Sequence, residues 1–210
     1  MWLPLLTAVS ACLAILGKYR GPGPLVYLFK PLTTVLILLL ALLASPPVTP
    51  AYQWLIVLGL LFSLAGDVFL MLPRDRFVAG LVSFLIAHLF YIAAFAQQAD
   101  GTPALPGLLV FAVYSVLLLG MLLPRTGRLR LPVIAYAVVL SAMGWQAAAQ
   151  WALHGDLRAL LALAGATLFI LSDSILALDR FVRPFAAAQA LLLSSYYLAQ
   201  WLIALSVQAG

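Results

Sequence analysis

Charge is the scarcest property of this 210-residue sequence, because only 8% of its residues are charged and glutamate is absent. An ordinary soluble domain is about 25% charged and about 45–50% apolar, whereas 66% of this chain is apolar. Eleven Lys and Arg residues and six Asp residues are too few to cover the surface of a globule of this size. The composition therefore excludes a soluble globular protein and predicts one that is embedded in a lipid bilayer.

Cysteine and histidine are also nearly absent. The single cysteine, Cys12, excludes a disulfide framework and a metal site with several thiolate ligands. Two histidines, His88 and His154, are too few for most zinc sites built by a protein. We therefore expect neither a metal nor another cofactor. The net charge of +5 is not arranged as a basic stripe with interleaved aromatic residues, so we expect no nucleic-acid partner.

Long apolar runs, separated by charges, prolines and glycines, make up nearly the whole chain. A helix needs about 20 residues to cross a hydrocarbon core of about 30 Å. Eight runs approach this length, at residues 2–17, 25–44, 53–72, 77–97, 105–123, 131–151, 158–178 and 184–206. No Lys or Arg precedes the first run, so we expect it to remain as a span rather than to be cleaved as a signal peptide. The prediction is one all-α domain, residues 1–210, of eight transmembrane helices.

Basic residues gather in every second connection between these runs. The first, third, fifth and seventh connections contain nine of them, whereas the other three contain Arg158 alone. The nine are Lys18, Arg20, Arg74, Arg76, Arg125, Arg128, Arg130, Arg180 and Arg183. Basic connections usually remain in the cytoplasm. Both termini are therefore expected outside the cytoplasm, in a multi-pass protein of a bacterial inner membrane.

Two aspartates lie inside predicted spans, in stretches that resemble each other. Asp67 and Asp173 are each followed, after a short apolar stretch, by Asp-Arg-Phe-Val, at residues 75–78 and 179–182. Both spans run in the same direction, which suggests a parallel duplication of four spans. At 1.5 Å per residue, each carboxylate lies roughly 9–10 Å inside the cytoplasmic boundary. A charge there costs at least about 2.5–3.5 kcal/mol, which favours a functional role. The alternative is a structural Asp satisfied by a neighbouring Lys or Tyr.

Other polar side chains occur at a similar depth. They are Lys30 in the second span, His88 and Tyr91 on one face of the fourth, Tyr136 in the sixth, and Gln189, Tyr196 and Gln200 in the eighth. Taken singly, a buried histidine is more often a hydrogen-bonded core residue, and a lysine often extends to the lipid headgroups. Taken together, these residues predict a polar pocket that opens toward the cytoplasmic leaflet.

Two carboxyl groups in a pocket of low dielectric constant favour acid–base chemistry, because desolvation and mutual repulsion keep one of them protonated. Glycosidases use such a pair against an oxocarbenium-like transition state. Hydrolysis of a vinyl ether needs the same groups, since protonation of the alkene carbon also gives an oxocarbenium ion. Asp67 and Asp173 are therefore candidate catalytic residues of a membrane hydrolase. The alternatives are a transporter of lipids or small solutes, which the few polar residues in the outer halves of the spans disfavour, and a noncatalytic membrane interaction protein.

Several short stretches carry a resemblance that extends from the second to the eighth span. They include Lys30-Pro31-Leu32, Gly66-Asp67-Val68-Phe69-Leu70, Ala87-His88-Leu89-Phe90-Tyr91, Ser172-Asp173 and Tyr196-Tyr197-Leu198-Ala199-Gln200. Together they resemble the YhhN-type lysoplasmalogenase family of eight-span membrane proteins. The resemblance implies hydrolysis of the sn-1 vinyl ether of a lysoplasmalogen to a fatty aldehyde and glycerophosphoethanolamine or glycerophosphocholine. It matches Asp67 and Asp173 to the family's acidic positions, and leaves open which of them is the acid.

The resemblance implies a lysophospholipid substrate taken from the surrounding bilayer. Its alkenyl chain would lie among the spans, and its phosphate would meet cationic side chains near the interface. The residues expected to contact this substrate are Lys30, His88, Tyr91, Tyr136, Gln189, Tyr196, Tyr197, Arg76 and Arg180. The sequence makes no prediction about the oligomeric state.

Overall fold

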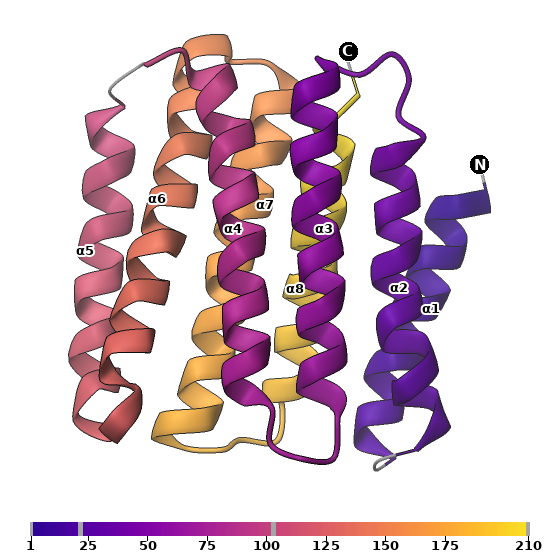
Figure 1. Ribbon diagram of the computed structural model, residues 1–210, viewed down its shortest axis with the longest axis vertical. Helices are drawn as coiled ribbons and strands as arrows, with labels where there is room; N and C mark the ends of the chain where they lie inside the picture. The colour runs from indigo at the N-terminus through magenta and orange to yellow at the C-terminus, as the bar shows by residue number, and fades with distance from the viewer. Residues whose placement is uncertain (1, 21–22, 102–103, 209–210) are drawn as a thin grey trace.

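Eight long helices account for most of the computed structural model, which describes residues 2–20, 23–101 and 104–208 (Figure 1). They are α1 Trp2–Tyr19, α2 Pro24–Leu42, α3 Pro50–Met71, α4 Phe77–Ala99, α5 Leu105–Leu122, α6 Arg130–His154, α7 Leu157–Ala177 and α8 Ala188–Leu205. Each of the eight is long and apolar enough to cross a membrane. The spans of α5 and α6 include adjoining short turns, and the span of α7 includes the π-helical segment Leu178–Val182. No strand occurs in these described ranges. The predicted all-α architecture with eight transmembrane helices is confirmed.

Local signals set the ends of several helices. The side chains of Thr49 and Asp156 cap α3 and α7 by accepting backbone N–H groups at 3.0 and 2.8 Å. The bond from the N–H of Ala159 lowers the pKa of the Asp156 carboxyl group. The predicted eighth span, at residues 184–206, begins too early, since α8 starts at Ala188. The physical reason is that the N–H of Phe185 bonds to the side chain of Asp179, at 3.2 Å, instead of entering a helix.

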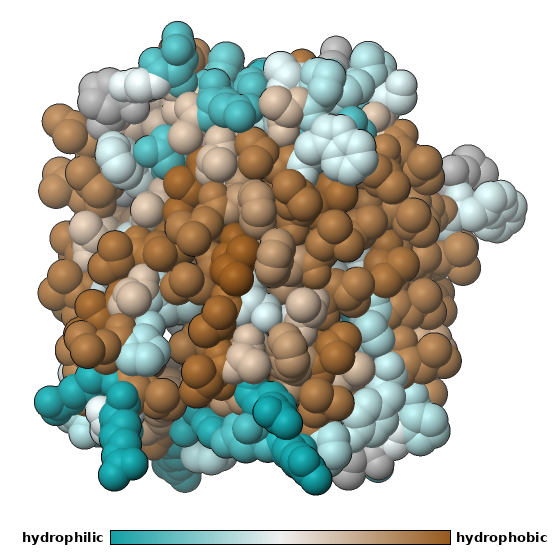
Figure 2. All heavy atoms as spheres, in the orientation of Figure 1, coloured by the Kyte–Doolittle hydropathy of each residue, from teal (hydrophilic) through white to brown (hydrophobic). Residues whose placement is uncertain are grey.

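Consecutive helices run antiparallel, so both termini lie at the same end of the bundle (Figure 1). Helices α7 and α8 lie behind α3 and α4 in this view, with α1 and α2 on one side and α5 and α6 on the other. A broad apolar band separates the polar ends of the molecule (Figure 2). Side chains of the peripheral helix α5 are among the most exposed apolar residues, with Val116 at 68% and Leu117 at 67%. In a membrane protein this band faces the lipid.

The two halves of the chain pack in equivalent ways. Helix α2 contacts α8, and α4 contacts α6, which are corresponding contacts if α1–α4 and α5–α8 are two copies of one unit. Lys30 contacts Asp67, which follows 37 residues later. Tyr136 contacts Asp173, which also follows 37 residues later. This is the arrangement that a parallel duplication of four spans predicts.

One end of the bundle, here named the basic end, contains the α1–α2, α3–α4, α5–α6 and α7–α8 connections. The nine basic residues predicted to share one side of the membrane lie in or next to these connections. At the opposite end Arg158 pairs with Asp156 at 3.1 Å. The candidate site described next lies toward the basic end.

Candidate active site

Asp67, on α3, lies in a buried polar cluster. One carboxylate oxygen, Oδ1, is 3.2 Å from Nζ of Lys30 on α2. The other, Oδ2, accepts hydrogen bonds from Thr34 of α2 at 2.6 Å and from Tyr196 of α8 at 2.7 Å. The side chains of Lys30 and Asp67 are only 7% and 2% exposed. Both carboxylate oxygens therefore have partners, and the charge of Asp67 is balanced inside the bundle.

Two tyrosines predicted to contact a substrate, Tyr91 and Tyr197, are buried in the bundle. Tyr91 donates a hydrogen bond to Oε1 of Gln200 at 2.7 Å and lies 3.5 Å from the hydroxyl of Ser63. The ring of Tyr197 packs against that of Tyr196, with 5.3 Å between centroids. Both Tyr91 and Tyr197 are buried, and neither lines the two cavities described below. Contact between these tyrosines and a substrate stays a prediction.

Asp173, on α7, has different surroundings. Its Oδ2 accepts a hydrogen bond from Tyr136 of α6 at 2.6 Å and lies 3.9 Å from Nε2 of His88 on α4. Its other oxygen, Oδ1, receives no hydrogen bond within the described part of the chain, and no Lys or Arg pairs with it there. Unlike Asp67, Asp173 has a carboxylate oxygen available to another molecule.

The imidazole of His88 is fully buried beside Asp173. Neither ring nitrogen forms a hydrogen bond with any described residue. Ring contacts with Phe169 and Tyr136, at centroid distances of 4.5 and 5.4 Å, hold the imidazole in place. Buried polar atoms without partners are uncommon because they cost free energy. His88 lines neither of the two cavities described below, although its Nε2 lies 3.9 Å from Asp173. Within the described ranges, no three His, Cys, Asp or Glu side chains are grouped so that they could hold a metal ion.

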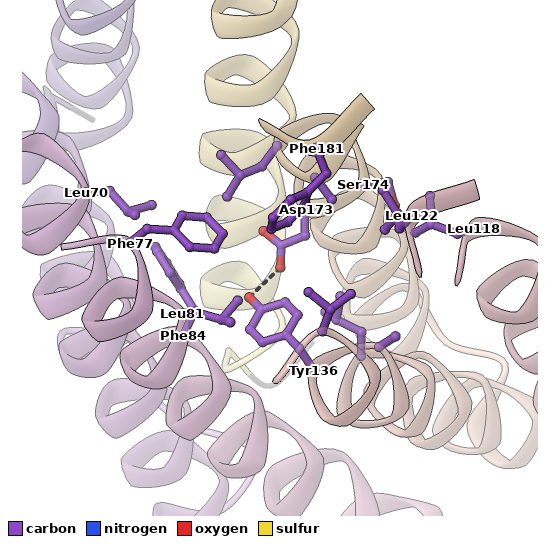
Figure 3. Close-up of a pocket in the computed structure, with 15 residues that line it drawn as sticks. Leu70, Phe77, Leu81, Phe84, Leu118, Leu122, Tyr136, Asp173, Ser174 and Phe181 are labelled. Atoms are coloured by element: carbon purple, nitrogen blue, oxygen red, sulfur yellow. Dashed lines mark hydrogen bonds between the residues drawn. The ribbon is translucent and has the colours of Figure 1, made fainter. Parts of the chain in front are cut away.

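Asp173 lies in the wall of a narrow cavity of about 50 Å³, here named the apolar pocket (Figure 3). Its lining consists of Leu70, Phe77, Leu81, Phe84, Leu118, Leu122, Val133, Tyr136, Ala137, Leu140, Asp173, Ser174, Leu176, Ala177 and Phe181. Figure 3 shows the carboxyl group of Asp173 and the hydroxyl of Tyr136 pointing toward each other, with Phe77 and Leu81 nearby on the α4 side. Among these described residues Asp173 is the only acidic one, and the lining is otherwise apolar except for the hydroxyl groups of Tyr136 and Ser174.

A second cavity of about 550 Å³, here named the polar vestibule, lies at the basic end. Its charged and amide lining residues are Lys18, Lys30, Arg74, Asp75, Arg76, Asp179, Arg180 and Gln189. Of the residues predicted to contact a substrate, Lys30, Arg76, Arg180 and Gln189 meet here. Leu70, Phe77 and Leu176 line both the vestibule and the apolar pocket, so the two cavities are adjacent.

The two Asp-Arg-Phe-Val stretches bind to each other beside the vestibule. Arg180 donates a hydrogen bond to Asp75 at 2.6 Å, and its guanidinium lies 4.9 Å from the centre of the Phe77 ring. Phe77 also meets the ring of Phe181 edge-on, at a centroid distance of 5.8 Å. The hydrogen bond from Arg180 lowers the pKa of the Asp75 carboxyl group. These contacts join the α3–α4 and α7–α8 connections.

The structure brings the predicted polar residues together in two groups rather than in one pocket. Asp67 and Asp173 form no hydrogen bond with each other, and Asp67 lines neither cavity. Aromatic rings connect the groups, since Tyr196 is 5.5 Å from Phe169 and Phe169 is 4.5 Å from His88, measured between centroids. The physical reason is that each carboxylate is approached by a helix of the other half, α8 for Asp67 and α4 for Asp173.

Comparison with known proteins places this arrangement in a family. The model of the YhhN family matches residues 25–207. The uncharacterized membrane protein YhhN of Escherichia coli O157:H7 is 33% identical over 207 residues, which are 99% of each chain. Human lysoplasmalogenase TMEM86A is 40% identical over 170 residues, covering 79% of this chain and 68% of the relative. Human lysoplasmalogenase TMEM86B is 38% identical over 160 residues, covering 74% and 64%. No solved structure matches. This multi-pass membrane protein therefore belongs to the YhhN family.

Proposed function

We propose that this protein hydrolyses the sn-1 vinyl ether bond of lysoplasmalogens and releases a fatty aldehyde and glycerophosphoethanolamine or glycerophosphocholine. Two human relatives are named lysoplasmalogenases. The observation that carries the proposal is the position of Asp173, which has a free carboxylate oxygen in the wall of an apolar pocket adjacent to a cationic vestibule. The two linings match the chemistry of a lipid with one chain and a phosphate, with the vinyl ether end of its chain at the apolar pocket and its phosphate in the vestibule.

Asp173 acts as the general acid in the proposed mechanism. Its carboxyl group gives a proton to the vinyl carbon remote from the ether oxygen, and the carbon attached to oxygen becomes an oxocarbenium ion. The resulting carboxylate stabilises this cation from the pocket wall. Water then adds to the cation and returns a proton to Asp173. The hemiacetal collapses as its hydroxyl proton passes through the carboxyl group to the glycerol oxygen, which leaves an aldehyde and an alcohol.

Two neighbours orient Asp173 and the attacking water. Tyr136 binds Oδ2 of Asp173 at 2.6 Å and leaves Oδ1 free for proton transfer. His88, whose ring nitrogens have no partner among the described residues, is suited to hold the water. Asp67 is a positioning residue in this proposal, because its ion pair with Lys30 and its bond to Tyr196 connect α2, α3 and α8.

The proposed site works from the cytoplasmic leaflet of a bacterial inner membrane. The support for this orientation is that the basic end contains nine basic residues and the opposite end contains Arg158 alone. The polar vestibule lies at the basic end, so a lysophospholipid would enter it from the inner leaflet.

Mass spectrometry of lipids incubated with the purified protein in liposomes tests the proposal. Lysoplasmenylethanolamine should yield a fatty aldehyde, and the saturated ether analogue should yield none. Asp173→Asn should lower kcat by about a hundredfold or more, because general acid catalysis typically contributes 10²–10⁴-fold. The control Asp100→Asn changes the same charge at the opposite end and should keep wild-type activity. No aldehyde from the wild type, or undiminished kcat in a folded Asp173→Asn variant, would contradict the proposal.

A further inference from the structure

The two Asp-Arg-Phe-Val stretches at the basic end could form two ion pairs with each other, and only one of these forms. Asp75 and Arg180 form an ion pair at 2.6 Å, but the reciprocal pair between Asp179 and Arg76 is not formed. Asp179 accepts the N–H of Phe185 at 3.2 Å and the side-chain amide of Gln189 at 3.5 Å. Neither Asp179 nor Arg76 has an ion-pair partner in the described ranges, and both line the polar vestibule.

The remaining charges of the vestibule define what it can bind. Lys30 is neutralised by Asp67, and Arg180 by Asp75. Lys18, Arg74 and Arg76 have no carboxylate partner within the part of the chain that the structure describes, and Asp179 has no cationic partner there. A simple anion would be attracted by the cations and repelled by Asp179. A molecule with an anionic and a cationic group satisfies both kinds of side chain.

We propose that Asp179 binds the ammonium group of a zwitterionic phospholipid headgroup, while the phosphate of that headgroup lies against Arg74 and Arg76. This inference rests on the proposed function, because the headgroup belongs to the lipid whose chain reaches Asp173. Ammonium-to-carboxylate hydrogen bonds are stronger than those between neutral groups. Asp179 therefore determines specificity for headgroups with an amine.

The substitution Asp179→Asn separates charge from structure at this position. Asparagine keeps an oxygen that accepts the N–H of Phe185, and it removes the negative charge. Its NH2 group replaces the oxygen that accepts from Gln189, and a turned Gln189 amide restores that contact with its own oxygen as the acceptor. The matched control is Asp100→Asn, which removes a negative charge at the end of α4 away from the vestibule. A purely structural role of Asp179 would predict the same effect of Asp179→Asn on every lipid.

Binding of two saturated ether lysolipids tests the proposal without catalysis. 1-O-alkyl-glycerophosphoethanolamine and 1-O-alkyl-glycerophosphoethanol share a phosphodiester and differ in the amine. The wild type should bind the ethanolamine lipid about tenfold more tightly, the lower end expected for a hydrogen bond to a charged group. Asp179→Asn should raise the Kd of the ethanolamine lipid about tenfold and should not raise that of the ethanol lipid, whose phosphate Asp179 repels. Equal Kd values for the two lipids in the wild type, or equal losses in Asp179→Asn, would overturn the proposal.

The binding measurement tests the headgroup site, and the hydrolysis assay tests the proposed reaction, so either claim can be wrong while the other holds. If the wild type forms no aldehyde but the Kd pattern holds, the proposed reaction is wrong and the headgroup site stands. If aldehyde forms but the Kd pattern is missing, the reaction stands and Asp179 has no role in specificity. With both intact, Asp179→Asn should raise KM for lysoplasmenylethanolamine about tenfold while kcat stays unchanged.

Discussion

Two aspartates at corresponding positions of the two halves have different neighbours. The residue 37 positions earlier is Lys30 for Asp67 and Tyr136 for Asp173. A lysine neutralises the carboxylate it touches, whereas a tyrosine offers one hydrogen bond and no charge. One copy of the carboxyl group is therefore fixed in an ion pair, and the other is available to a molecule in the apolar pocket.

Removing one member of the buried ion pair should destabilise the protein more than removing both. In Asp67→Asn, Lys30 remains in the interior without a counter-charge, and breaking such a pair costs about 3–5 kcal/mol. The double variant Lys30→Met with Asp67→Asn has no buried charge and should recover most of that stability. The free energy of unfolding in mixed detergent micelles measures the difference. A double variant that is no more stable than Asp67→Asn would contradict a structural role for the pair.

The sequence singled out the candidate catalytic residues but did not predict how they are grouped. The depth of Asp67 and Asp173 inside apolar runs singled both out, because a charge in hydrocarbon requires a reason. Their separation depends on α4 and α8 each approaching the other half of the bundle, and no local pattern reports that packing. Thr34 could have been assigned to Asp67 from its place one turn after Lys30. Nothing in the sequence indicates that Arg180 pairs with Asp75.

At the scale of elements, the predicted spans found every helix but not every helix end. The predicted start at residue 158 is one residue from the start of α7, which follows the Asp156 cap, whereas the predicted start at residue 53 is three residues later than that of α3, which follows the Thr49 cap. The start of α8 was missed because residues 184–187 are apolar enough to extend the span. The contact that keeps them out of the helix, from Phe185 to Asp179, joins residues on either side of a turn.

The close approach of α7 to α8 at Gly165 should tolerate no side chain. A Cβ at this position would lie 2.7 Å from a side-chain carbon of Ile203 and 2.9 Å from the carbonyl oxygen of Ala199. That oxygen belongs to the backbone of α8 and cannot rotate away. Gly165→Ala should cost about 1–3 kcal/mol of stability, lower the thermal midpoint in detergent and reduce aldehyde formation. Gly120→Ala, where an added Cβ meets nothing within 4 Å, is the control. Equal effects of the two substitutions would show that helix packing at Gly165 is not limiting.

At the scale of the whole molecule, charge is concentrated at the ends of an apolar bundle (Figure 2). This pattern made the architecture predictable, because the positions of a few charges separate the spans and distinguish the two ends. The cavities were less predictable. The polar vestibule and the apolar pocket share Leu70 of α3, Phe77 at the start of α4 and Leu176 near the end of α7. These segments come together only in the folded bundle.

Labelling of single cysteines tests the orientation on which access from the inner leaflet depends. In a Cys12→Ala background, Arg128→Cys places a thiol at the basic end and Ala51→Cys places one at the opposite end, both at exposed positions. Because nine basic residues lie at one end and Arg158 alone at the other, the basic end should face the cytoplasm. In spheroplasts, a maleimide that cannot cross membranes should label Ala51→Cys at once and Arg128→Cys only after lysis. The reverse pattern would place the polar vestibule on the outer face, where the lysolipid would have to enter from the outer leaflet.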